Sequence, residues 1–222
     1  PEVEPRPTQP STAMDHVELK PYPFPEGVTI PRLMPYQEYP WNGDGYLAAE
    51  VLRLKHVHGI KNAIETGTCL GSTAIWLAEV FDTVVTCEIH KPFFDIAVAR
   101  YNGSNIYRTN VDSVVLLSTL VTNADPRLYY LDAHWGDHCP LLDELEAIAK
   151  AGVKPCIVIH DMMVYGKDFG YDKMPDGRPF NLELIRSHLN AIYGEGGWKH
   201  NYPTSVEGAC RGWISIGPVS VP

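Results

Sequence analysis

The chain has 222 residues, 45% of them hydrophobic, and a formal net charge of −9. This length fits one domain with an extension and an ample core. The negative charge and the lack of any run of Lys or Arg disfavour a nucleic-acid partner, because phosphate contacts need clustered cations. No apolar run approaches the ~20 residues of a membrane span, so no membrane association is expected. The five cysteines are scattered without a C-x-x-C pair, which favours a reducing, cytoplasmic setting.

The first 41 residues differ in composition from the rest of the chain. Ten of the 19 prolines lie there, and proline removes backbone donors and blocks helix formation. We expect residues 1–15 to be loose. Residues 16–41 carry many apolar side chains and are expected to pack on the domain or on a second subunit, which would make a homodimer through this extension. A lid over a substrate is the functional alternative. The predicted organisation is a Pro-rich extension at 1–41 and a main domain at 42–222.

The main domain shows helices alternating with short apolar strands. A helix over 45–58 has apolar residues at helical spacing, and Gly59 follows as its stop. After it we predict a strand ending at 63–64, a helix at 73–81, a strand at 83–88, a helix at 92–100, a strand at 105–108, a helix at 113–120, a strand at 127–131, a helix at 140–151, a strand at 155–159, a helix at 181–193 and strands at 198–202 and 212–216. This order predicts an α/β fold: a doubly wound, Rossmann-like seven-stranded sheet, mostly parallel with an antiparallel closing pair. Ligands bind at the carboxyl ends of such strands.

The stretch 61–78 carries the most informative local pattern. Glu65, Gly67 and Gly71 follow a short apolar run, and Ser72 stands where the N-cap of the next helix belongs. Glycine lets the backbone approach a ligand closely, and the N–H groups of a helix N-terminus can point at it. The spacing is not the G-x-G-x-x-G of a dinucleotide site, and an acidic residue before the first glycine suits a cationic amino-acid group better than a pyrophosphate. An ordinary strand-to-helix turn is the structural alternative.

A second acidic residue, Glu88, ends the next strand about 20 residues beyond the glycines, where a carboxylate is placed to bind ribose hydroxyls. The E-x-G-x-x-x-G turn together with Glu88 resembles the class I S-adenosylmethionine-dependent methyltransferases. The resemblance implies that S-adenosylmethionine is the cofactor and that Asp112 binds its adenine amino group. Asp112 is also placed to cap the helix that follows, and both roles could hold at once. The implied cofactor site comprises Glu65, Thr66, Gly67, Gly71, Ser72, Glu88 and Asp112.

Two adjacent central strands end in Asp132 and Asp161, with His134 and His160 beside them. Carboxylates brought together at strand tips can hold a hard divalent cation, and such an ion lowers the pKa of a bound hydroxyl. Asp132 and Asp161 are therefore the predicted metal ligands, with Mg²⁺ as the first choice of metal. Asp132, His134 and His160 are the predicted catalytic residues.

The run 131–135 resembles the strand-four motif of the metal-dependent catechol O-methyltransferases, in which an aspartate ligand is shortly followed by His-Trp. Similar arrangements occur in macrolide-sugar O-methyltransferases and in relatives of cephalosporin hydroxylase. The chain departs from the catechol pattern at Met162, where that family has an amide. It departs from the hydroxylase-like pattern at His160, which precedes Asp161 in place of an acidic residue. The third metal ligand therefore stays open.

The two histidines and the loop after the last of these strands each allow more than one interpretation. With Mg²⁺ a histidine is better suited to act as a general base, whereas with Zn²⁺, Mn²⁺ or Fe²⁺ it could be a ligand. We favour His134 as base or substrate contact and leave His160 open; both could also be hydrogen-bonded structural residues. The loop 162–180 could close over a substrate or be a plain surface loop.

The resemblance implies a methyltransferase that acts, with metal assistance, on an oxygen of a small hydroxylated acceptor. Two other classes stay open. One is a metal-dependent hydroxylase or hydrolase on the same scaffold. The other is a binding module that keeps the fold but not the chemistry, against which the retained carboxylates of Glu65 and Glu88 count.

Overall fold

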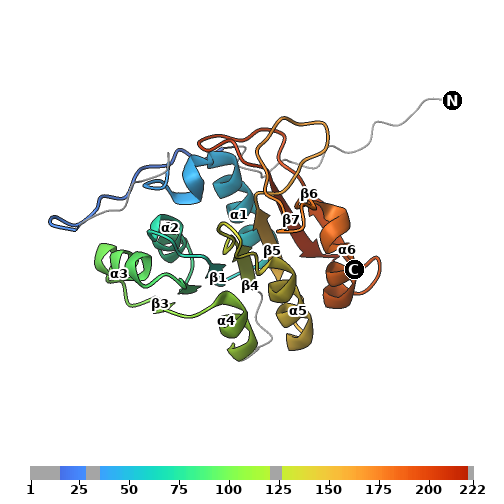
Figure 1. Cartoon of the computed structure of the whole chain (residues 1–222), viewed down its shortest axis with the longest axis horizontal. Coiled ribbons are helices and arrows are strands. Elements are labelled where there is room, and N and C mark those ends of the chain that lie inside the picture. Colours follow the sequence, from blue (N-terminus) through green and yellow to red (C-terminus); the bar gives the residue numbers. More distant parts are fainter. Residues whose placement is uncertain (1–15, 29–35, 121–126, 220–222) are drawn as a thin grey trace.

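The computed structural model describes residues 16–28, 36–120 and 127–219. In this part of the chain a seven-stranded sheet forms the centre, in the order β3-β2-β1-β4-β5-β7-β6 (Figure 1). The strands are β1 (Asn62–Thr66), β2 (Thr83–Cys87), β3 (Ile106–Thr109), β4 (Arg127–Leu131), β5 (Cys156–His160), β6 (Trp198–Asn201) and β7 (Trp213–Pro218). Strands β1 to β5 pair in parallel, β7 is antiparallel to β5, and β6 is antiparallel to β7. The predicted doubly wound sheet with an antiparallel closing pair is confirmed.

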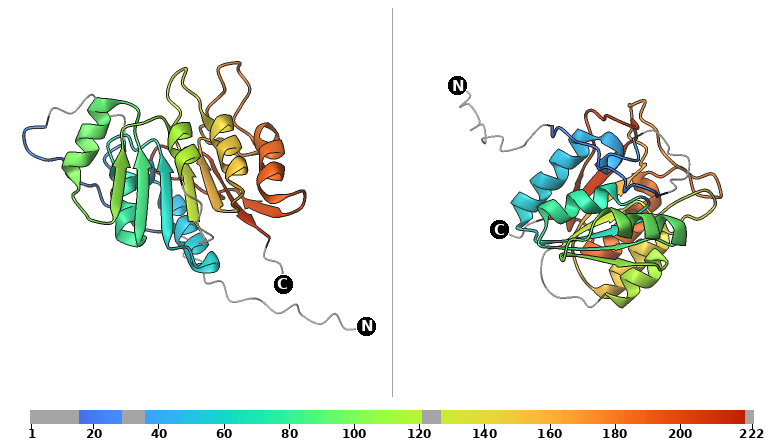
Figure 2. Two further views of the ribbon diagram at one scale, coloured as in Figure 1. Left: turned by 90° about the horizontal axis from the view of Figure 1, so that it is seen from below. Right: turned by 90° about the vertical axis from the view of Figure 1, so that its left-hand side faces the viewer.

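Helices cover both faces of this sheet (Figure 2). They are the 3-10 helix η1 (Pro40–Gly43) and the α-helices α1 (Gly45–His58), α2 (Ser72–Val80), α3 (Lys91–Arg100), α4 (Ser113–Thr119), α5 (Leu141–Ala151) and α6 (Leu182–Tyr193). Helices η1, α1 and α2 contribute to one buried cluster, and α4, α5 and α6 contribute to the other. Helix α1 has the predicted bounds and ends at Gly59, whose φ of 60° is the left-handed conformation that glycine adopts readily.

The central strands supply alternate side chains to the two clusters. Leu128 and Tyr130 of β4 join the cluster of α1 and α2, whereas Tyr129 and Leu131 join that of α4 to α6. This is the period of two expected of a strand. In a strand buried on both faces every side chain is apolar or paired, which is why β5 reads as a continuous apolar run in the sequence.

Two predictions about the glycine loop are wrong in detail. Strand β1 continues to Thr66, so the polar pair 65–66 belongs to the strand and not to the turn. Ser72 is the first residue of α2 and not its N-cap, which is Gly71 at a φ of 84°. The Ser72 hydroxyl donates to the backbone oxygen of Gln37 at 2.8 Å instead of capping the helix.

The described part of the N-terminal extension packs on its own domain. The backbone N–H of Val17 donates to the oxygen of Gly45 at 3.1 Å. Trp41 is completely buried, with its ring 5.2 Å from that of Trp76 and 4.8 Å from that of Tyr130. The extension and the main domain therefore share one core. Residues 1–15, which we predicted to be loose, lie outside the described residues. None of the helices in the described ranges is long and apolar enough to cross a membrane.

Candidate cofactor and metal site

A cleft of about 580 Å³, its open mouth included, lies at the carboxyl ends of the central strands. A second hollow of about 340 Å³ lies beside it. The two hollows share four lining residues, namely Gln37, Gly67, Cys69 and Asp132. Together they form one elongated site in which the glycine loop stands between two compartments.

Gly67 brings the glycine loop against the tip of β4. Its φ is 81°, and a Cβ atom on this residue would lie 2.4 Å from the backbone oxygen of Asp132 and 2.8 Å from the Cα of Ala133. A side chain cannot fit at this point. The close approach places the loop next to the residues that follow β4.

Glu88 lines the larger cleft from the end of β2 and is only 6% exposed. One carboxylate oxygen accepts from the backbone N–H of Cys69 at 2.7 Å, and the other accepts from the backbone N–H of His90 at 2.8 Å. Each carboxylate oxygen has two acceptor directions, so each keeps one for a ligand hydroxyl. The predicted ribose contact is thus held in a fixed orientation beside the cleft.

Glu65 lines the smaller hollow from β1 and is 1% exposed. Burial raises the pKa of Glu65 to about 8; a hydrogen bond from Thr86 Oγ1, at 2.6 Å, opposes this rise, and the nearby Asp132 and Glu88 add to it. A cationic group bound in the hollow would favour the ionised form. The role of Glu65 as a contact for a cationic amino-acid group stays a prediction.

Three other predicted cofactor residues are Asp112, Ser72 and Thr66. Asp112 caps α4 by accepting from the N–H of Val114 at 2.8 Å, which is its predicted structural role. Ser72 lines the smaller hollow with Gly71. Thr66 is fully buried beneath the cleft.

A buried carboxyl that sequence reasoning missed, that of Glu144, lies below the site. Burial raises the pKa of Glu144 to about 7, against the opposing effect of the nearby Ser113 and Thr66 hydroxyls. The residue stands on the inner face of the amphipathic helix α5, where its neighbours in sequence gave no sign of a polar cluster.

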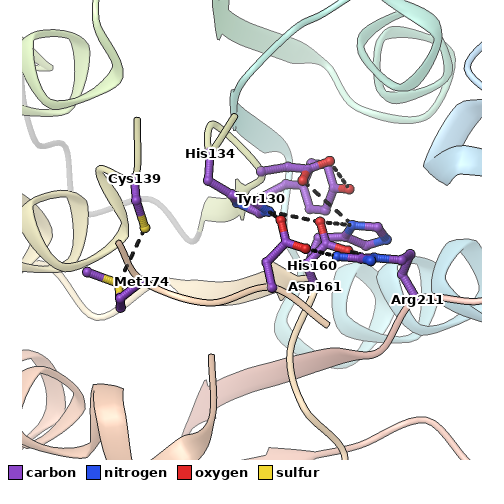
Figure 3. Close-up of polar contacts among 9 residues, drawn as sticks. Tyr130, His134, Cys139, His160, Asp161, Met174 and Arg211 are labelled. Atoms are coloured by element: carbon purple, nitrogen blue, oxygen red, sulfur yellow. Dashed lines mark hydrogen bonds and ion pairs between the residues drawn. The ribbon is translucent and has the colours of Figure 1, made fainter. Parts of the chain in front are cut away.

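The predicted metal and catalytic residues come together at the ends of β4 and β5. Figure 3 shows three of them, His134, His160 and Asp161. One ligand atom each from Asp132, His134 and Asp161 lies within 4.8 Å of the others. The Nε2 atom of His134 is 2.8 Å from Oδ2 of Asp161. Tyr130 donates to Oδ2 of Asp132 at 2.9 Å and so orients that carboxylate. Asp161 has a φ of 58°, which is uncommon for a residue other than glycine and is often found at functional sites.

Two residues of this cluster were not predicted. Asp172 places Oδ2 3.2 Å from Nε2 of His134. Arg211 donates through Nε to Asp161 and through Nη2 to Asp172. Both come from loops, and the pairing of Gly170 with Arg211 brings the two loops together. The sequence carried no local pattern that could have found them, although Asp172 lies in the loop 162–180, for which we left open a lid or a plain surface loop.

His160 enters the cluster from the buried side. Its side chain is 2% exposed, and Nδ1 lies 3.3 Å from Asp161 Oδ2 and 3.6 Å from Asp132 Oδ1. Within the described part of the chain this Nδ1 has no hydrogen-bond partner. This imidazole nitrogen lies at ion-pair distance from two carboxylates without a hydrogen bond to either, and together these groups are a donor set that fits a divalent cation.

The charges of the cluster are strongly coupled. Burial lowers the pKa of His134, but hydrogen bonds with Asp161 and Asp172 and the nearby negative charges outweigh this effect and raise it to about 10. Burial raises the pKa of Asp161, but the neighbouring His160 and His134 outweigh it and hold that pKa well below its usual range. Without an ion, protonated imidazoles and Arg211 thus compensate the carboxylates.

Among known proteins, this chain resembles solved structures in its fold. No family model matches the sequence, and no curated protein matches it. Solved structures do match. A protein assigned as an O-methyltransferase from Klebsiella pneumoniae is 15% identical with a TM-score of 0.56, over 78% of this chain and 79% of its own. A protein assigned as a caffeoyl-CoA O-methyltransferase from Staphylococcus aureus is 14% identical with a TM-score of 0.53, over 78% and 83%. The SAH-bound methyltransferase PaMTH1 of Podospora anserina is 15% identical with a TM-score of 0.52, over 79% of each chain.

These similarities confirm the fold class. The chain has the fold of the class I S-adenosylmethionine-dependent methyltransferases. Because a fold of this kind hosts many functions, the activity has to be argued from the site.

Proposed function

We propose that this protein is an S-adenosylmethionine-dependent methyltransferase that methylates an oxygen of a small hydroxylated molecule with the help of a divalent cation. One observation carries the proposal. The buried carboxylates of Glu65 and Glu88 flank the glycine loop, and the cleft beside them opens onto the cluster of Asp132, His134 and Asp161. A cofactor site and a reaction centre therefore adjoin at the same edge of the sheet.

The two compartments have separate roles in the proposed reaction. When bound, S-adenosylmethionine would supply a methyl group on a positively charged sulfur, and a cation would lower the pKa of the acceptor hydroxyl. Glu65, in the smaller hollow, would bind the ammonium group, and Glu88, in the larger cleft, would bind the ribose hydroxyls. The transfer forms a bond from the acceptor oxygen to the methyl carbon while the bond from that carbon to sulfur breaks. The hydroxyl proton passes to a carboxylate of the Asp132 cluster. Alignment of the two substrates accounts for most of what the protein must provide.

The cofactor is tested by calorimetric titration with S-adenosylhomocysteine, with and without Mg²⁺. We expect micromolar binding in the wild type. Glu88→Gln should weaken it at least tenfold, because an amide nitrogen replaces one of the two acceptors. Glu183→Gln, on the exposed face of α6 and paired with Arg186, is the matched control and should leave binding unchanged.

Each outcome decides between the candidate classes. Binding that Glu88→Gln loses supports the methyltransferase and justifies a screen of hydroxylated acceptors for methylated product. Folded wild-type protein that gives no heat at either metal condition would contradict the proposal and leave the metal-dependent hydroxylase or hydrolase and the binding module.

A further inference from the structure

We propose that His134 is a metal ligand and not the proton acceptor, so that the centre takes a borderline divalent cation such as Mn²⁺, Fe²⁺ or Zn²⁺ in preference to Mg²⁺. This inference deepens the proposed function and rests on it, since it assumes a metal centre beside the methyl-donor cleft. Magnesium prefers oxygen ligands, whereas imidazole suits the first-row transition metals and zinc.

The distances around His134 fit coordination. Its Nε2 lies 2.8 Å from Oδ2 of Asp161 and 3.2 Å from Oδ2 of Asp172, and it shares the 4.8 Å group with Asp132. Ligand atoms bound to one ion at metal distances of about 2.0–2.2 Å are separated from one another by roughly 2.8 Å at a right angle and up to roughly 4.4 Å at opposite positions. The atoms therefore already surround a space that one ion can occupy after small adjustments.

The imidazole of His134 is held in place and shielded. Its side chain is 9% exposed, and its ring packs edge-on against the completely buried Phe180, with 4.9 Å between the ring centroids. A general base must reach the proton of the acceptor. A ring fixed with Nε2 directed at carboxylates is better placed to bind an ion.

A second, independent observation comes from His160. Its Nδ1 is buried without a hydrogen-bond partner among the described residues and faces the oxygens of Asp161 and Asp132. A buried polar atom left unsatisfied is costly. An ion held by these carboxylates would account for a buried polar group at this point that makes no hydrogen bond.

The balance of charge also suits a divalent cation. Three carboxylates, those of Asp132, Asp161 and Asp172, meet one guanidinium, that of Arg211. Coordination requires neutral imidazoles, and the group then has two more negative charges than positive ones. The imidazole protons balance this charge in the ion-free protein, and a divalent cation would balance it in their place. Arg211 donates hydrogen bonds to Oδ1 of Asp161 and to Oδ1 of Asp172. The Oδ2 atoms of both carboxylates therefore remain directed at His134.

The test is metal selectivity, measured by calorimetry on the full chain after removal of metals with a chelator. In the wild type we expect one site that binds Mn²⁺ and Zn²⁺ at least tenfold more tightly than Mg²⁺. The spin-echo spectrum of bound Mn²⁺ should show modulation from a coordinated nitrogen. His134→Asp, which makes an all-oxygen site, should remove that modulation and narrow the Mn²⁺ to Mg²⁺ affinity ratio at least tenfold.

The matched control is His56→Asp, at an exposed position of α1, which should leave the ratio and the spectrum unchanged. Mg²⁺ that binds as tightly as Mn²⁺, or bound Mn²⁺ without nitrogen modulation, would overturn the inference. Both results come from the wild type, so a variant that fails to fold does not affect them. S-adenosylhomocysteine titrated into the same protein separates the two proposals: binding of that ligand with failed metal selectivity rejects the metal inference alone, and selectivity without such binding rejects the methyltransferase alone.

Discussion

The guanidinium of Arg100 stacks on the ring of Phe24, with its Cζ atom 4.0 Å from the ring centroid. The same side chain donates to the backbone oxygens of Tyr22 and Leu70, at 2.5 Å each, and to the Ser72 hydroxyl at 3.0 Å. One residue of α3 therefore joins the N-terminal extension to the glycine loop.

Arg100→Ala is expected to weaken the packing of both the N-terminal extension and the glycine loop. The loss of the hydrogen bonds and the ring contact should lower the free energy of unfolding by about 2 kcal/mol. It should also weaken S-adenosylhomocysteine binding, because the loop oxygen of Leu70 loses its donor. Urea denaturation and calorimetry measure the two effects. The control is Arg178→Ala, an exposed residue whose partner is Asp176. An Arg100→Ala protein with unchanged ligand affinity would mean that the extension plays no part in shaping the cofactor site.

Gly67→Ala should be among the most damaging small substitutions in the chain. The φ of 81° alone costs about 1–2 kcal/mol for a residue with a Cβ. The clash with the backbone of Asp132 and Ala133 adds to this, since backbone cannot move aside cheaply. Gly152→Ala is a matched control, because its φ is 69° and nothing lies within 4 Å of the added Cβ. Thermal and urea unfolding should place Gly67→Ala below Gly152→Ala by at least ~2 kcal/mol; equal losses would contradict the close approach of loop and strand.

Sequence reasoning predicted the order of elements because central strands such as β4 and β5 are short apolar runs and helices such as α5 and α6 have clear periodicity. It misjudged the end of β1, since the polar residues Glu65 and Thr66 resemble a turn. Glu65 lies inside a strand because Thr86, on the neighbouring strand, donates to its carboxyl group. That partner is 21 residues away, and no local pattern reveals it.

The residues of the candidate site were predictable where they follow strands of the sheet, but not where they lie in loops. Asp132, His134 and Asp161 follow adjacent strands, so the topology alone brings them together. Asp172 and Arg211 reach the cluster through long-range loop contacts, such as the hydrogen bond from the N–H of Asp172 to the oxygen of Asp161 at 2.9 Å. Loops lack the periodicity from which such contacts could be inferred.

Glu65 should make the stability of the ligand-free protein depend on pH. Its pKa is about 8 in the folded state, against a reference value of 4.5, so the folded protein holds this proton more tightly than the unfolded chain. The contribution is fully present below pH 4.5 and is lost as the pH rises toward 8, with a limiting slope of about 1.4 kcal/mol per pH unit. In Glu65→Gln the part of this decline that Glu65 causes should be absent.

The measurement is the free energy of unfolding by urea at several pH values between those two limits. Glu144, whose pKa is about 7, changes stability in the same direction, so the effect of Glu65 is the difference between wild type and variant. Glu183→Gln serves as the exposed control. Parallel profiles for the wild type and Glu65→Gln would show that Glu65 is already ionised in the ligand-free protein.

Arg211→Gln removes the guanidinium that binds Asp161 and Asp172. In the presence of a chelator the free energy of unfolding should fall by about 1–3 kcal/mol, because two partly buried carboxylates lose a charged hydrogen-bond partner. Saturating Mn²⁺ should then stabilise the variant more than it stabilises the wild type, since a cation replaces the missing positive charge and no longer meets repulsion from Arg211. Urea unfolding with chelator and with Mn²⁺ measures both terms, and Arg178→Gln, in the same loop as Asp172, is the control. A smaller gain from Mn²⁺ in Arg211→Gln than in the wild type would mean that Arg211 mainly orients the carboxylates for the ion and does not oppose its binding.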